Sequence, residues 1–187
     1  MDRDRGDGAV HAGCDDLDPV VVVCVALGAI QRLEKSFSRS LKEPTPEGFK
    51  KFREFNDREG MIDWECFFVP EENFYLEALD KVSEDDVIFD VGAGDLRFDL
   101  LLSPIVKKVY AVEINPEILG KALKIIGFDI PKNLIAIRGN AFEFDLPRDV
   151  TKVICLMIHR KHDFPESWKD RTIMYGTHQG LKVEAPT

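Results

Sequence analysis

Short apolar runs alternate with segments of helical periodicity from about residue 70 onwards. This alternation predicts β-α-β units, in which parallel strands form one sheet and helices cover its faces. The apolar runs place the strands, and apolar positions that recur every three or four residues place the helices. We expect strands at 86–91, 108–113, 133–138, 152–158 and Thr172–Gly176, a weaker strand at Leu181–Glu184, and helices at 71–81, 95–103 and 116–127.

The residues before this alternating part divide into two further units. Residues 1–16 are polar and rich in glycine and aspartate, which predicts a disordered tail. Residues 17–69 are predicted to form a helical N-terminal extension of the domain at 70–187. The apolar run from Pro19 to Ile30 has 12 residues, whereas a helix that spans a bilayer needs about 20. We therefore expect a buried helix there, although the same run also suits a strand.

A glycine turn follows the first predicted strand of the domain. The strand ends at Asp90, and Gly92 and Gly94 come before the next helix. A strand that turns sharply and enters a helix leaves backbone N–H groups free at the carboxyl edge of the sheet, where nucleotide-type ligands bind. Glycine suits such a turn because it tolerates positive φ and lets a ligand approach the backbone.

An acid stands at the end of the next strand, at a spacing typical of ribose binding. Glu113 lies 19 positions after Gly94 and closes the predicted strand 108–113. Its two acceptor oxygens match the two neighbouring hydroxyls of a ribose, and the alternative is a solvated strand-end acid. Arg97 stands where dinucleotide sites have a third glycine. This departure disfavours an NAD-type oxidoreductase and favours an adenosine ligand.

Three motifs, in this order, resemble class I S-adenosylmethionine-dependent methyltransferases. They are Asp90-x-Gly92-x-Gly94, the strand end 111–116 and the loop 138–147. The resemblance covers roughly residues 73–159. It implies S-adenosylmethionine (SAM) as cofactor and a three-layer α/β sandwich with a mostly parallel Rossmann-like sheet. The 104 residues from position 84 onwards are fewer than the family's seven strands need, so we expect the sheet to be truncated at its C-terminal strands.

The resemblance also implies roles for individual residues. The two glycines of the turn would contact the amino-acid end of SAM. Asp90 would either bind the ammonium group of SAM or tie the turn by accepting backbone N–H groups. Ile114 would lie against the adenine ring, and the loop residues Asn140 and Ala141 would contact adenine, with Asn140 at a position where the family more often has aspartate.

The acceptor side has one candidate catalytic residue. His159 follows the fourth predicted strand, at a place that faces the transferable methyl group in the family. It suits a general base, or alternatively a strand-end cap bonded to the backbone. The Asn/Asp-Pro-Pro-Tyr/Phe signature of enzymes that methylate base amines or glutamine amides is absent from the sequence. The basic cluster 160–162 suits an acidic substrate or a solvated loop.

Composition narrows the choice of partners. The 187 residues carry a formal net charge of −9, which argues against non-specific binding to nucleic acid. The four cysteines have no metal-ligand spacing, so we expect no metal site and reduced thiols in a cytoplasmic protein without a membrane segment. A truncated sheet leaves an edge, which the N-terminal helices or a second copy in a homo-oligomer would cover.

Two functions from different classes follow from these patterns. The first is a SAM-dependent methyltransferase, of the EC 2.1.1 class, that transfers a methyl group to an unidentified acceptor. The alternative is a non-catalytic SAM-binding or scaffold subunit of a complex, which would fit the short C-terminal part of the chain.

Overall fold

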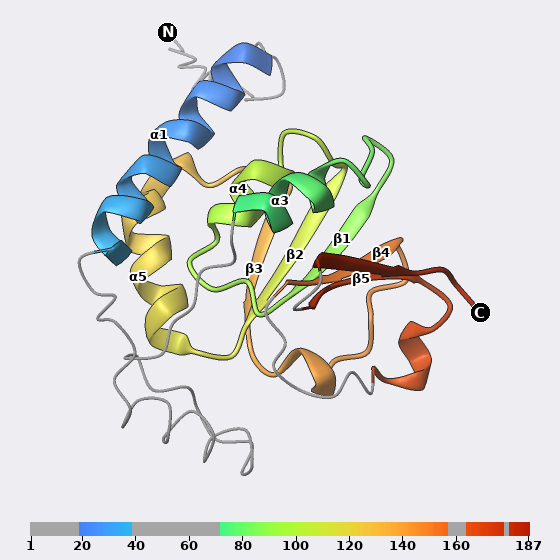
Figure 1. The fold of residues 1–187 in the computed structure, drawn as a ribbon. Helices are drawn as coiled ribbons and strands as arrows, with labels where there is room; N and C mark the ends of the chain where they lie inside the picture. The colour runs from blue at the N-terminus through green and yellow to red at the C-terminus, as the bar shows by residue number, and fades with distance from the viewer. Residues whose placement is uncertain (1–18, 39–71, 157–163, 178–179) are drawn as a thin grey trace, which may run out of the picture.

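A single sheet with helices packed against it forms the centre of the molecule (Figure 1). The structure is a computed structural model, and it describes residues 19–38, 72–156, 164–177 and 180–187. The strands of the sheet are β1 (Val87–Val91), β2 (Lys108–Glu113), β3 (Leu134–Arg138), β4 (Lys152–Cys155), β5 (Thr172–Thr177) and β6 (Gly180–Glu184). The α-helices are α1 (Pro19–Ser38), α3 (Glu72–Leu79), α4 (Arg97–Leu102) and α5 (Pro116–Ile126).

The six strands lie in the order β3-β2-β1-β4-β5-β6. The first five are parallel, and β6 pairs antiparallel with β5. The predicted α/β fold with a mostly parallel Rossmann-like sheet is therefore confirmed, and so is the weaker strand near the C-terminus. The fourth strand ends at Cys155, and the rest of its predicted length falls largely outside the described residues.

Helix α1 begins at Pro19, as predicted, so the apolar run near the start of the chain is helical and not a strand. Its buried side chains Ala29, Ile30 and Leu33 join the core beside α4 and α5. An ion pair between Arg32 and Asp129 connects the helix to the segment after α5. The remainder of the predicted helical extension, residues 39–69, lies outside the described residues. Within the described ranges, no helix is long and apolar enough to cross a membrane.

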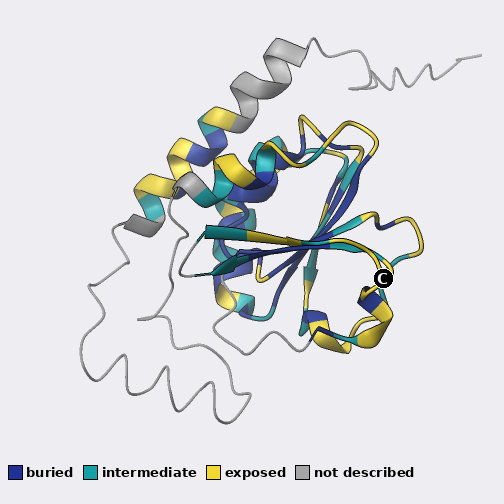
Figure 2. Ribbon diagram, turned by 45° about the vertical axis from the view of Figure 1, so that its right-hand side comes forward, coloured by how far each residue is buried: buried dark blue, intermediate teal, exposed yellow. Residues whose placement is uncertain are grey.

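Side chains of the sheet enter two separate apolar clusters because they alternate between its faces. On one face, strand residues such as Ile88 and Ile154 pack with residues of all four α-helices. On the other face, Phe89 and Val153 pack with the 3₁₀ helices η4 (Ala141–Glu143) and η5 (Glu166–Trp168). Among the described residues, α-helices therefore cover only one face. Figure 2 shows the central strands buried between these two layers.

Helix α5 has the termini that its sequence predicts. The Asn115 side chain accepts hydrogen bonds from the backbone N–H groups of Glu117 at 3.0 Å and Ile118 at 3.3 Å, and Pro116 is the first helical residue. The helix stops at Gly127, whose φ of 61° suits glycine. This cap fixes the start of α5. Ile114, the residue before the cap, directly follows Glu113.

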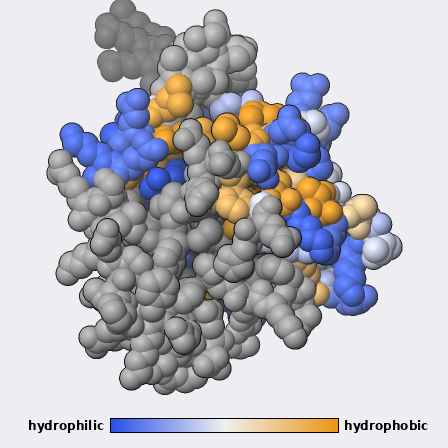
Figure 3. Space-filling view, viewed as in Figure 1, coloured by the Kyte–Doolittle hydropathy of each residue, from blue (hydrophilic) through white to orange (hydrophobic). Residues whose placement is uncertain are grey.

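The edge strand β6 lies beside α3. The backbone N–H of Leu181 donates to the Glu77 carboxylate at 3.1 Å, so this helix of the N-terminal half satisfies a donor at the sheet edge. Figure 3 shows apolar surface over the region of α3 and α4, where Leu76 is 58% exposed. The hairpin β5–β6 provides the last two of the six strands.

Candidate cofactor site

The predicted site residues gather at one edge of the sheet. Strands β1, β2 and β3 are parallel, so the segments that follow their carboxyl ends are neighbours. The glycine turn follows β1, Glu113 closes β2 and Asn140 follows β3. The backbone N–H of Gly139 donates to the carbonyl of Glu113 at 3.0 Å, which fixes the last two segments against each other.

The glycine turn is tight, but its N–H groups are not free. Gly92 and Gly94 have φ values of 77° and 59°, which favour glycine. The N–H groups of Gly92 and Ala93 both donate to the carbonyl of Val112, at 2.9 and 3.0 Å, and that of Gly94 donates to Glu113. The prediction of free N–H groups at this turn was therefore wrong, because the turn lies close enough to β2 to bond with it. Within the described part of the chain, the carbonyl groups of both glycines accept no hydrogen bond.

Leu96 takes the left-handed conformation that a third glycine would suit. Its φ is 65° and its ψ is 8°, directly before α4. A side chain in this region costs about 1–2 kcal/mol. The Leu96 side chain is fully buried in the core, and this burial offsets the cost of the backbone conformation.

Glu113 is buried and held by backbone donors. One carboxylate oxygen accepts the N–H of Gly94 and the other accepts the N–H of Asn115, both at 2.7 Å. Burial raises the pKa of Glu113, and the two N–H groups partly oppose that shift. The alternative of a solvated acid does not describe this side chain, which is 4% exposed. Each oxygen has a second lone pair, so the ribose role stays a prediction that the geometry permits.

Asp90 points toward the helical face of the sheet. It alternates along β1 with Phe89 and Val91, which belong to the opposite cluster, and it is 4% exposed. Burial raises the pKa of Asp90 to about 7, and the nearby charge of Glu113 adds to the shift. The N–H groups of Gly92, Ala93 and Gly94 bond to other acceptors, so Asp90 does not tie the turn through them.

A second buried acid, Asp99, was not expected from the sequence. It lies on the inner face of α4, is fully buried, and neither of its carboxylate oxygens has a hydrogen-bond partner. Burial and the neighbouring charge of Asp90 raise its pKa well above the usual range. One signal in the sequence could have pointed to Asp99. It is the single charged residue in the otherwise apolar sequence 98–102, which is unusual on a short helix.

Two further groups border the buried acids. Arg97 binds Asp95 through Nε at 2.9 Å and Nη2 at 2.6 Å, and both side chains are largely buried. Asp95 is thus the partner of a buried ion pair. The Tyr75 ring of α3 stacks on Phe98 with centroids 5.0 Å apart, and burial raises the pKa of the Tyr75 hydroxyl.

The remaining predicted cofactor residues lie at the same edge. Asn140 caps η4: its Oδ1 accepts the N–H of Phe142 at 3.2 Å and its Nδ2 donates to Glu143 at 3.1 Å. Ala141 is buried, and Ile114 is half-buried next to Glu113. Contacts of these three residues with adenine stay predictions.

The acceptor side is described only at its border. His159 and the basic cluster 160–162 lie outside the described residues, so the role of His159 stays a prediction. Cys155, the last residue of β4, is fully buried, and burial and the charge of Asp90 raise the pKa of its thiol. A neutral thiol is a poor nucleophile. The described residues contain no group of acids, histidines and cysteines able to hold a metal ion.

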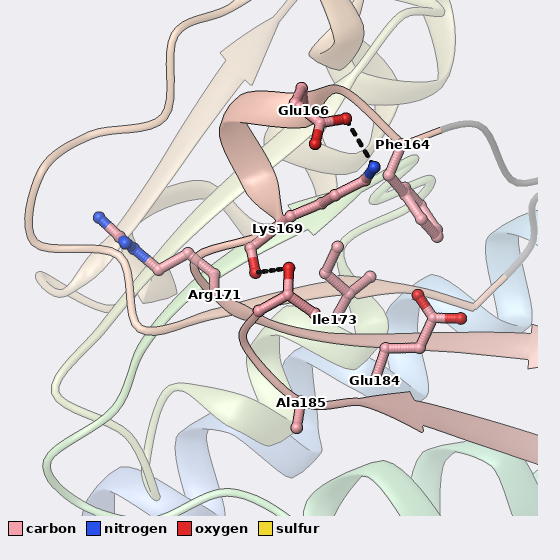
Figure 4. Close-up of a pocket in the computed structure, with 8 residues that line it drawn as sticks. Phe164, Glu166, Lys169, Arg171, Ile173, Glu184 and Ala185 are labelled. Atoms are coloured by element: carbon pink, nitrogen blue, oxygen red, sulfur yellow. Dashed lines mark hydrogen bonds and ion pairs between the residues drawn. The ribbon is translucent and has the colours of Figure 1, made fainter.

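One cavity of about 680 Å³ lies elsewhere on the molecule (Figure 4). It is at the amino end of β5, at the edge opposite the glycine turn, and Phe164 and Ile173 supply its apolar lining. Lys169, which also lines it, pairs with Glu166 at 2.6 Å. This cavity is therefore separate from the predicted cofactor site.

The fold and the site together define a Rossmann-like α/β protein with acids at the carboxyl edge of a parallel sheet. No protein-family model matches the chain. A protein-lysine N-methyltransferase of Saccharolobus islandicus is 31% identical over 104 residues, which cover 52% of this chain and 62% of that protein. An uncharacterized protein of Methanocaldococcus jannaschii is 31% identical over 88 residues, covering 45% of this chain and 33% of that protein. The chain thus spans less than two thirds of the length of either relative.

Among solved structures, parts of two methyltransferases are similar to this chain. Trm5 of Methanocaldococcus jannaschii in complex with adenosine is 27% identical, with 61% of this chain and 38% of that chain covered and a TM-score of 0.49. An RNA methyltransferase from Salinibacter ruber in complex with S-adenosyl-L-homocysteine is 19% identical, with 63% and 90% covered and a TM-score of 0.45. The resemblance to class I SAM-dependent methyltransferases, which three sequence motifs indicated, is confirmed.

Proposed function

We propose that this chain is a SAM-dependent methyltransferase whose acceptor is an amino group of a protein lysine. The observation that carries the proposal is the chemistry of one sheet edge. There, a buried carboxylate at the end of β2 stands beside a turn in which the carbonyl groups of Gly92 and Gly94 accept no hydrogen bond from the described residues, whereas the N–H groups of the turn are used.

This set of groups suits the methyl donor better than a dinucleotide. A pyrophosphate needs N–H donors, and the turn has already used those of Gly92, Ala93 and Gly94. The carbonyl groups of the two turn glycines and the acid Asp90 suit a ligand with a positively charged amino-acid end instead. Glu113 suits the ribose hydroxyls of the same ligand.

The methyl donor supplies an activated methyl group on a sulfonium, so the protein mainly positions the reactants. The glycine turn and Asp90 would bind the amino-acid end, Glu113 the ribose, and Asn140 and Ile114 the adenine. A protonated lysine must lose a proton before it attacks, and His159 is the predicted base.

The choice of acceptor rests on the relative from Saccharolobus islandicus, whose name gives a protein lysine as the acceptor. The missing signature for methylating base amines agrees with this choice.

Calorimetric titration with S-adenosylhomocysteine tests the cofactor site. We expect the intact chain to bind it and Glu113→Gln to bind at least about tenfold more weakly, a difference of about 1.4 kcal/mol. Glu84→Gln is the matched control, because Glu84 is exposed and precedes β1 at the opposite edge. No binding by the intact chain would overturn the proposal.

Transfer of a labelled methyl group tests the activity and the acceptor. The intact chain is incubated with labelled SAM and a mixture of unmodified proteins, and the products are hydrolysed and analysed for methylated lysine. The same mixture with its lysines blocked beforehand is the control. Binding without transfer to any acceptor would favour the scaffold alternative, and transfer to another residue would replace lysine as the acceptor.

A further inference from the structure

We infer that Asp99 is a positioning residue of the cofactor site: it holds a proton against Asp90 in the free chain and releases it when an amino-acid ammonium group binds beside Asp90. The inference rests on the proposed function for the ligand, and it extends that function to a residue outside the three motifs.

The two acids face each other between the sheet and α4. Asp90 is the second-to-last residue of β1 and lies on the helical side of the sheet, and Asp99 lies on the buried side of α4, the helix that follows the glycine turn. The Asp99 carboxyl lies within hydrogen-bonding reach of Asp90. Two carboxylates have only acceptor oxygens, so a hydrogen bond between them requires a proton on one of them.

The lack of any other partner makes that proton necessary. Both oxygens of Asp99 are buried and neither has a donor. A fully ionised, unpaired carboxylate in this place would carry a large desolvation cost and would repel Asp90. With a proton on Asp99, the hydroxyl donates to Asp90 and the two acids share one negative charge.

Among the residues that the structure describes, no cation takes the place of the proton. Glu113 of β2 and Asp95 add negative charge, while Tyr75 of α3 and Cys155 of β4 are neutral groups. Arg97, at the start of the same helix as Asp99, is bound by Asp95 through two of its nitrogens. In the described part of the chain, no lysine or arginine pairs with Asp90 or Asp99.

A cationic ligand group supplies the missing charge. When an ammonium group binds at Asp90, the positive charge lowers the pKa of the pair. The O–H bond of Asp99 then breaks, the proton passes to the solvent, and two carboxylates remain beside one ammonium. The binding reaction therefore releases a proton, and Asp99 sets how strongly Asp90 attracts the ligand at a given pH.

The test is the proton balance of S-adenosylhomocysteine binding. Titration of the intact chain at pH 7 in two buffers of different ionisation enthalpy gives the number of protons released, and we expect up to about one per site. In Asp99→Asn the amide donates permanently to Asp90, so binding persists and the release disappears. Asp85→Asn is the matched control, because Asp85 is an exposed acid before β1, at the edge of the sheet opposite the glycine turn, and it should release as many protons as the intact chain.

A second measurement is made without ligand, so it does not depend on whether the variant binds. Infrared difference spectra of the free chain, with isotope-labelled aspartate, should show a protonated carboxyl group at pH 7 that Asp99→Asn lacks. Circular dichroism checks that the variant is folded.

The outcomes separate this inference from the proposed function. Binding without proton release by the intact chain, or release that persists in Asp99→Asn, overturns the inference and leaves the function standing. Absence of binding overturns the function and, with it, the ligand-driven release. Absence of the protonated carboxyl signal overturns the shared proton in every case.

Discussion

The carboxylate of Glu113 accepts the backbone N–H of Gly94 at 2.7 Å, and this bond joins the end of β2 to the turn that follows β1. The second oxygen of the same carboxylate accepts the N–H of Asn115, whose side chain caps α5. One buried side chain therefore holds the turn and the start of a helix in place. The residue predicted to bind ribose is also part of the architecture of its own site.

This double role predicts that Glu113→Ala destabilises the fold as well as the site. Two backbone N–H groups, of Gly94 and Asn115, would lose their acceptor, at a cost of about 1–3 kcal/mol each. Urea unfolding of the cofactor-free chain measures the loss. Glu113→Gln keeps one acceptor oxygen and should lose less. Equal stability of Glu113→Ala and the intact chain would contradict the structural role.

Leu96 should stay the better residue at its left-handed position, although glycine has the matching backbone preference. Leu96→Gly relieves about 1–2 kcal/mol of backbone strain and gives up a buried leucine side chain, whose removal costs about 2–5 kcal/mol. We expect net destabilisation of a few kcal/mol in a denaturant titration. A more stable glycine variant would show that the strain, and not the packing, decides this position.

Gly176 should not accept alanine, because a Cβ there would lie 2.2 Å from the carbonyl oxygen of Leu156. That oxygen belongs to the backbone at the end of β4, so relief requires the two strand ends to separate. We expect Gly176→Ala to cost about 1–3 kcal/mol. Gly120→Ala in α5 is the control: its Cβ meets nothing within 4 Å, and it should stabilise the chain by about 0.5–1 kcal/mol. A neutral Gly176→Ala would contradict the close approach.

The acid pair predicts a characteristic dependence of stability on pH. The folded-state pKa of Asp90 is about 7, above the usual value of 3.8, and that of Asp99 is also raised. A group with a raised pKa contributes stability that is complete below about pH 4 and is lost as the pH rises through its folded-state pKa. The free energy of unfolding of Asp99→Asn, relative to the intact chain, should therefore increase between about pH 4 and pH 8. A constant difference over this range would contradict the shared proton.

Trp168 should tolerate phenylalanine better than its burial indicates. The indole is fully buried among aromatic rings, and its Nε1 has no hydrogen-bond partner. Trp168→Phe removes a buried donor that lacks an acceptor, which costs about 1–3 kcal/mol of stability. This gain offsets part of the packing lost with the larger ring. Trp168→Ala loses the ring altogether and should cost about 3–5 kcal/mol. Thermal unfolding compares the two, and equal losses would argue that the donor is satisfied in solution.

The strands and the ends of α5 could be predicted from the sequence because their signals are local. Central strands such as β1 are continuous apolar runs, and the cap Asn115-Pro116 has the residues that a helix start requires. The convergence of the glycine turn, Glu113 and Asn140 also followed, because parallel strands align their carboxyl ends.

The chemistry between elements could not be predicted in the same way. The N–H groups of the turn are used because the carbonyl of Val112 lies against them, which depends on the packing of two strands. Asp99 stands out in the sequence only as the single charged residue of 98–102, and its full burial next to the charge of Asp90 depends on how α4 packs on the sheet. The expected truncation of the sheet followed from the number of residues, and the described sheet has six strands in place of the seven typical of the family.

The crossover from β3 to β4 is short. It takes 13 residues, 139–151, and contains one 3₁₀ helix in place of a longer α-helix. Its first residues border the cofactor site, whereas Arg148 is exposed at the opposite edge of the sheet, just before β4. A segment grafted at Arg148 would extend away from the site and leave the order of the strands unchanged. The molecule therefore offers protein engineers an attachment point that is separate in space from its chemistry.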